Sequence, residues 1–110
     1  MKLPNGNRAV VDERKLREYL LSRSHPIGRF KATVFAAAGF DAEDWSELAT
    51  QLRALAAHGD AELAGRSQYG QKYMISGVLR GSQGATLDVV AVWIVPLPDD
   101  APHLVTVYPK

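Results

Sequence analysis

Apolar residues recur at helical spacing through the first half of the sequence. In residues 24–40, SHPIGRFKATVFAAAGF, the side chains Ile27, Phe30, Val34 and Ala38 follow one another at steps of three and four. This period places them on one side of a helix, which can then pack against a core. The segment is the densest group of helix signals and candidate functional side chains in the chain.

The ends of this helix are marked by residues with defined backbone preferences. Pro26 suits the first helical position, because it has no N–H to leave unpaired, so His25 becomes the predicted N-cap. Gly39 is expected to end the helix in the left-handed conformation, with Phe40 folding back onto its last turn.

Two more helices are predicted on either side. Residues 12–22 begin with Asp12, a good N-cap, and carry Leu16 and Leu20 on one face. A third helix follows Asp41, which forms a capping-box pattern with Asp44.

After residue 59 the apolar period changes from helical to two, which is typical of strands. Strands are predicted over residues 61–66, 72–80, 85–95 and 103–108, separated by turn residues. A bulge is expected at Gly77. In the last strand, strict alternation places Thr106 and Tyr108 on the same face as Leu104.

The predicted fold class is therefore α+β. Three N-terminal helices precede a four-stranded antiparallel sheet and pack on one face of it. The 110 residues, 46% of them hydrophobic and 23% charged, suit a single domain over residues 1–110.

Composition also narrows the setting. The chain has no cysteine, so disulfides, thiol catalysis and thiolate metal sites are excluded. The sequence shows neither a signal-peptide pattern nor an apolar run of membrane-spanning length, so a cytoplasmic protein without membrane contact is expected.

The net charge of +1 conceals an uneven distribution of charged residues. Residues 1–40 contain eight Lys and Arg against three Asp and Glu, whereas residues 41–64 contain one against six. A basic first third could bind a polyanion, or these charges could be ordinary solvated helix surfaces.

Several kinds of active site are absent from the sequence. His25, His58 and His103 lie far apart and match no metal-binding spacing, so neither a metal nor another cofactor is expected. The glycines at 81 and 84 lie between two strands and lack the helix that a phosphate-binding loop needs, and no serine lies in a nucleophile motif.

A metal-free set of polar side chains remains: His25, Arg29, Lys31, Lys72, Tyr73, Thr106 and Tyr108. Cleavage of RNA without a metal needs a base for the ribose 2′-hydroxyl, an acid for the leaving oxygen, and donors for charge on the phosphorane. These residue types supply all three. The same set would equally suit a non-catalytic anion-binding patch or a group of unrelated surface residues.

The run HPIGRFKATVFAAAGF, preceded by KLREYLLS, resembles the K-x-x-x-Y-L-L…H-P-x-G-x-x-K-A-x-x-F…G pattern of a small bacterial domain family of unknown function. Members of that family stand alone or occupy the C-terminal ends of polymorphic toxins. The closing LVTVYP resembles the last strand of toxin ribonucleases of the barnase/EndoU/colicin/RelE-like superfold.

The resemblance implies roles for the selected residues. It implies that His25, Lys31, Thr106 and Tyr108 are catalytic, with His25 as the general acid or base, and that Arg29, Lys72 and Tyr73 bind substrate. The implied partners are RNA and a cognate antitoxin or immunity protein.

The sequence is compatible with two functions. One is a metal-independent endoribonuclease toxin. The other is a non-catalytic interaction module, either an antitoxin or immunity partner or a degenerate toxin. Either protein could be a monomer or a homodimer, since the last strand could pair with a second chain.

Overall fold

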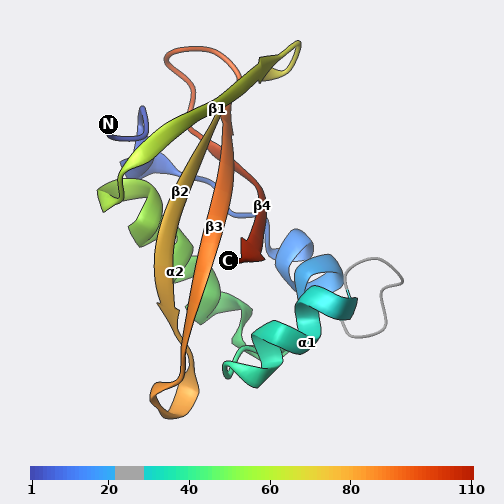
Figure 1. Cartoon of the computed structure of the whole chain (residues 1–110). Coiled ribbons are helices and arrows are strands. Elements are labelled where there is room, and N and C mark those ends of the chain that lie inside the picture. The colour runs from blue at the N-terminus through green and yellow to red at the C-terminus, as the bar shows by residue number, and fades with distance from the viewer. Residues whose placement is uncertain (22–28) are drawn as a thin grey trace.

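The computed structural model describes residues 1–21 and 29–110, and this part of the chain forms an antiparallel sheet flanked by two α-helices (Figure 1). The strands are β1 (Ala61–Ser67), β2 (Gly70–Arg80), β3 (Thr86–Val95) and β4 (His103–Pro109). The helices are α1 (Arg29–Ala37) and α2 (Trp45–His58). The predicted α+β class and the four-stranded antiparallel sheet are confirmed.

The strands lie in the order β1-β2-β3-β4, so each pairs with its neighbour in the sequence. The ladder between β2 and β3 runs without interruption from Gln71 opposite Val95 to Arg80 opposite Thr86. The expected bulge at Gly77 was therefore wrong. A Cβ atom at this position would lie 2.3 Å from the side chain of Leu55 in α2, so glycine makes room for the helix.

The core lies between the sheet and α2. Trp93 and Ile75 point from the sheet into this core, and Leu48 and Leu52 point into it from α2; all four side chains are fully buried. Burying large apolar side chains is the main source of stability for a domain of this size.

The region before α1 differs from the expected first helix. Residues Lys15–Leu20 form a π-helical turn, in which the Leu21 N–H donates to the Leu16 carbonyl oxygen at 2.8 Å. We call this segment the π turn. It and α1 lie beyond the β4 edge of the sheet, while α2 runs across a face (Figure 1). The prediction of three helices on one face is corrected accordingly.

The end of α1 forms as predicted. Gly39 has a φ of 100°, and its N–H donates to the Ala36 carbonyl, while the Phe40 N–H donates to the Phe35 carbonyl. These two bonds define a Schellman motif. Phe40 is 1% exposed, so the chain turns back into the core at this point.

The segment around Val10, which we call the arm, pairs with the beginning of β4. The Val10 N–H donates to the Pro102 carbonyl at 2.8 Å, and the Leu104 N–H donates to the Val10 carbonyl at 3.0 Å. The arm thus lies parallel to the beginning of β4, along its outer edge. Within residues 1–21 and 29–110, no helix is long and apolar enough to cross a membrane.

Candidate functional site at the edge of the sheet

A β-bulge in β4 determines which way the polar residues of this strand point. Thr106 lies opposite Val92 and Leu104 lies opposite Trp93, so Val105 is an extra residue without a partner in β3. Leu104 and Val107 both face the core and are 5% and 0% exposed. Thr106 and Tyr108 share a face as predicted, but Leu104 is not on it, because the bulge reverses the alternation.

The face of the sheet opposite α2 carries Thr106, Tyr108 and their cross-strand neighbours. We call it the open face and define it by the following residues: Lys72, Met74, Ser76, Val78, Val90, Val92, Ile94, Thr106 and Tyr108. Its rim is accessible, since Val78 is 53% and Tyr108 is 37% exposed, whereas Val90 is buried by its neighbours.

Two of the residues selected from the sequence meet at the edge of this face. The Lys31 ammonium of α1 donates a hydrogen bond to the Thr106 hydroxyl of β4, with Nζ and Oγ1 3.1 Å apart. The two residues are 75 positions apart in the sequence and the bond is partly buried. An ammonium beside a hydroxyl gives two kinds of donor at one point, which suits an anionic oxygen.

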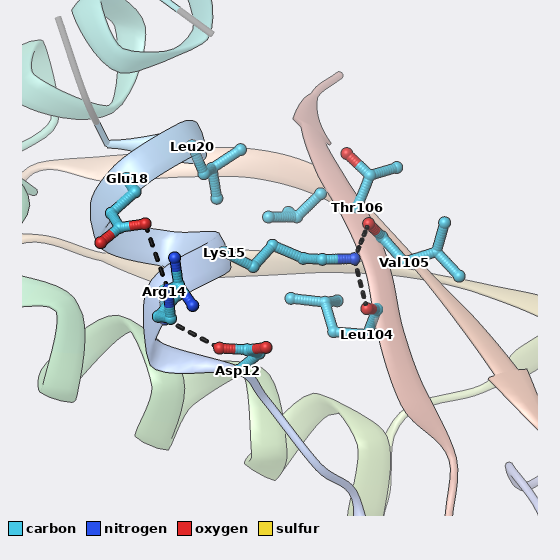
Figure 2. Close-up of a pocket in the computed structure, with 9 residues that line it drawn as sticks. Asp12, Arg14, Lys15, Glu18, Leu20, Leu104, Val105 and Thr106 are labelled. Atoms are coloured by element: carbon cyan, nitrogen blue, oxygen red, sulfur yellow. Dashed lines mark hydrogen bonds and ion pairs between the residues drawn. The ribbon is translucent and has the colours of Figure 1, made fainter. Parts of the chain in front are cut away.

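A groove runs along the outer edge of β4, between this strand and the π turn. It has a volume of about 660 Å³, within the range of small-ligand sites. We call it the edge groove; its lining residues are Asp12, Arg14, Lys15, Glu18, Leu20, Leu104, Val105, Thr106 and Val107 (Figure 2). Thr106 therefore belongs both to the open face and to the edge groove.

The charges of the edge groove are balanced. Two acidic residues, Asp12 and Glu18, and two basic residues, Arg14 and Lys15, line the same side of it, opposite β4 (Figure 2). The Arg14 Nε donates to a Glu18 carboxylate oxygen at 3.3 Å. The attraction of a polyanion to the two basic side chains would be largely cancelled by repulsion from the two acidic ones. The open face differs in this respect, because it carries Lys72 and is bordered by Lys31.

The other predicted site residues are distributed as follows. Lys72 lies on the open face opposite Ile94, which is in turn opposite His103. Tyr73 points the other way, opposite Trp93, and is 8% exposed. Arg29 is the first residue of α1, and His25 lies outside the described residues.

Lys15 is a residue of this region that was not selected from the sequence. Its ammonium donates to the carbonyl oxygens of Leu104 and Val105 at 3.1 and 2.9 Å (Figure 2). The one feature of the sequence that could have pointed to Lys15 is its place as the first residue of the K-x-x-x-Y-L-L pattern. The periodicity indicated only a solvent-facing lysine, because a bond to a distant strand leaves no local pattern.

Within residues 1–21 and 29–110, no group of three or more His, Asp or Glu side chains lies close enough together to hold a metal ion.

Comparison with known proteins gives a family and a fold. The model of the family "Domain of unknown function (DUF6883)" matches residues 2–110. The comparison with curated proteins gave no significant match.

A solved structure shares the fold over nearly the whole chain. It is described as "Contact-dependent growth inhibition toxin - immunity protein complex from Klebsiella pneumoniae 342". The matching chain is 20% identical, with a TM-score of 0.68, and the match covers 92% of the present chain and 99% of that chain. At this level of identity the likeness shows a common fold.

Proposed function

Since this chain belongs to the DUF6883 family of domains of unknown function, we propose its function from the site itself: it is a toxin that cleaves RNA without a metal ion and is neutralised by a protein partner. The proposed centre is the Lys31–Thr106 pair, with Tyr108 two residues further along β4.

The observation that carries this proposal is the bond from Lys31 Nζ to Thr106 Oγ1. Both residues were selected from the sequence for phosphate chemistry, and the fold brings them together from different elements. A phosphate oxygen beside Thr106 would accept hydrogen bonds from the Thr106 hydroxyl and from a second N–H of Lys31. Fixed donors of this kind stabilise the charge that grows on phosphorus in the transition state.

The reaction that suits these groups is transesterification of RNA. The ribose 2′-oxygen forms a bond to phosphorus while the bond from phosphorus to the 5′-oxygen breaks. The 2′-hydroxyl proton passes to a base, and the leaving 5′-oxygen takes a proton from an acid. We assign this proton transfer to His25, whose role rests on the sequence, and to the Tyr108 hydroxyl. The products would carry a 2′,3′-cyclic phosphate and a 5′-hydroxyl.

Substrate binding would extend across the open face. Lys72 is on β2 and Thr106 is on β4, with β3 between them. Their Cα atoms are therefore separated by at least two strand spacings, about 10 Å. Lys72 would contact a phosphate next to the scissile one. Tyr73 is not part of this surface, because it faces the core.

The fold agrees with membership of a toxin–immunity pair. The Klebsiella chain with the same fold comes from a complex of a growth-inhibition toxin with an immunity protein, and we propose the toxin role because of the Lys31–Thr106 pair. A partner that covers the open face would block access to Thr106, and this is how we propose that the toxin is neutralised.

A second candidate is a non-catalytic protein of the immunity type. It is favoured by three neighbouring apolar side chains on the open face: Met74 lies opposite Val92, and Ile94 is two residues further along β3. Apolar groups of this kind are more typical of protein interfaces than of phosphate sites. The Klebsiella complex contains a toxin and an immunity protein, so its description is compatible with either role.

The test is incubation of the purified protein with total RNA in the presence of EDTA, which silences contaminating metal-dependent nucleases. The variants are Lys31→Ala and Thr106→Val, and the matched control is Thr86→Val, an exposed threonine at the start of β3. Loss of one transition-state donor lowers a rate by roughly 100-fold. We therefore expect cleavage by the wild type and by Thr86→Val, and about 100-fold slower cleavage by the two site variants, all of them folded by circular dichroism.

Other outcomes would count against the proposal. Intact RNA with the folded wild-type protein would favour the immunity-type alternative. Cleavage that is equal in all four proteins would indicate a nuclease that does not use the Lys31–Thr106 pair.

A further inference from the structure

A single lysine holds two consecutive carbonyl groups of β4. The Lys15 ammonium donates to the Leu104 oxygen at 3.1 Å and to the Val105 oxygen at 2.9 Å, and both bonds are partly buried. Figure 2 shows the side chain extending from the π turn across the edge groove to the strand.

This pair of bonds depends on the bulge. In a regular strand, successive carbonyl groups point to opposite edges, so one ammonium on the outer edge could reach only one of them. Val105 is the extra residue of the bulge, and its insertion turns the carbonyls of Leu104 and Val105 to the same side. Lys15 thus binds a backbone geometry that exists only while the strand is bulged.

The bulge in turn sets the direction of the residues after it. With Val105 inserted, Val107 points into the core, and Thr106 and Tyr108 point to the open face. Without the insertion, the alternation that starts from the core residue Leu104 would bring Thr106 and Tyr108 inward and Val107 outward. The Lys31–Thr106 bond would then be lost.

We propose that Lys15 is a positioning residue, which fixes the β4 bulge and so holds Thr106 in reach of Lys31. This inference rests on the proposed function for its catalytic consequence, while its structural content can be tested without it. The Lys15 ammonium is engaged with two backbone carbonyls, so we assign it a role that acts through β4 and no contact with the phosphate.

The chain offers a matched control on the same turn. Arg17 is also a cation of the π turn, but its guanidinium pairs with Glu13 at 2.8 Å and is about half exposed, at 53%. Its removal takes away the same charge from the same element without touching β4.

The experiment compares wild type, Lys15→Met, Lys15→Arg and Arg17→Met by two readouts. The first is the set of NMR backbone chemical shifts of residues 104–108, which report the bulge whether or not the protein cleaves RNA. The second is steady-state cleavage of an RNA oligonucleotide. Lys15→Met should change the chemical shifts of residues 104–108. It should also lower kcat by about 100-fold with little change in KM, because Thr106 would be slightly misplaced.

Lys15→Arg should restore part of kcat, because a guanidinium has several N–H donors for the two carbonyls. Arg17→Met should match the wild type in both readouts. Unchanged shifts of residues 104–108 in folded Lys15→Met would overturn the proposal, as would moved shifts with full kcat in an active protein.

Failure of the proposed function would be recognised separately. If the wild type leaves RNA intact, the shifts alone decide whether Lys15 holds the bulge. If Lys15→Met does not fold, Lys15→Gln replaces it, since it keeps a polar side chain but is too short to span both carbonyls, and the same shifts are read.

Discussion

At the scale of single residues, the proposed site depends on which side chains can reach the same phosphate group. Lys31 and Thr106 are held together by a direct bond, whereas Lys72 lies two strands away on the open face. In the proposed enzyme these residues therefore differ in role: the pair acts at the scissile phosphate, and Lys72 adds affinity for the RNA chain.

This difference predicts a salt dependence. Each phosphate contact of a single-stranded nucleic acid adds about 0.7 to the slope of log K against log salt. Lys72→Met should therefore reduce the slope by about 0.7, measured by fluorescence anisotropy with a 2′-O-methyl RNA that lacks the attacking hydroxyl. Arg53→Met, an exposed cation of α2, is the control and should keep the wild-type slope. An equal slope in Lys72→Met and wild type would remove Lys72 from the RNA surface.

At the scale of elements, the tip of the β2–β3 hairpin is closely packed against the end of α1. A Cβ atom built on Gly39 would lie 2.6 Å from the Ser82 backbone nitrogen, and one built on Gly81 would lie 1.5 Å from the Ala38 carbonyl oxygen. These are backbone atoms, which cannot give way by a change of rotamer. Glycine at both positions allows the helix end and the hairpin to touch.

Gly39→Ala should therefore destabilise the protein more than Gly84→Ala. Both glycines have positive φ, at 100° and 81°, but a Cβ on Gly84 would meet nothing within 4 Å. The left-handed conformation costs alanine about 1–2 kcal/mol at either site. The clash at Gly39 adds about 1–3 kcal/mol more. Urea denaturation measures the difference, and equal free energies of unfolding would show that the contact with Ser82 relaxes freely.

The sequence allowed most elements to be predicted, because their signals are local. The glycine end of α1, the Asp41–Asp44 capping box and the strand alternation of β2 all depend on residues a few positions apart. Strict alternation could not show which residues of β4 point into the core and which point to the open face. The sequence contains one indication of the bulge. Leu104 and Val107 are both apolar and three positions apart, and in a strand with one buried face both can point into the core only if one residue is inserted between them.

The π turn and the Lys15 contacts were beyond this kind of prediction for a physical reason. An α-helix and a π-helical turn have nearly the same apolar pattern over six residues, so KLREYL indicates a helix in either case. The partners of Lys15 are 89 and 90 residues away. Lys31 and Thr106 were selected for their chemistry, and only the fold could show that they meet.

At the scale of the whole molecule, the arm around Val10 joins the beginning of the described chain to β4. Its N–H group donates to the Pro102 carbonyl, and its carbonyl accepts from Leu104, directly before the bulge. The arm therefore supports the strand that carries Thr106 and Tyr108.

Val10→Pro should test this support, because proline removes the N–H. The Pro102 carbonyl would lose its donor, at a cost of about 1–3 kcal/mol in the free energy of unfolding if the group stays buried. Val10→Thr keeps the N–H and changes only a side chain that is 42% exposed, so it should stay within about 0.5 kcal/mol of wild type. Thermal or urea unfolding of the two variants gives the comparison, and equal stability would show that the arm bond contributes nothing.

The pairing of Val10 with β4 also has a kinetic consequence. Contacts between residues so far apart in sequence form late in folding, because closing a long loop costs entropy before any bond is gained. The β2–β3 and β3–β4 hairpins, each joined by a short connection, can form early. The pairing of Val10 with β4 and the Lys31–Thr106 bond join residues far apart in the sequence and must form later. During refolding from urea, the sheet signal should therefore recover first, and the proposed cleavage of RNA should return only in the final phase.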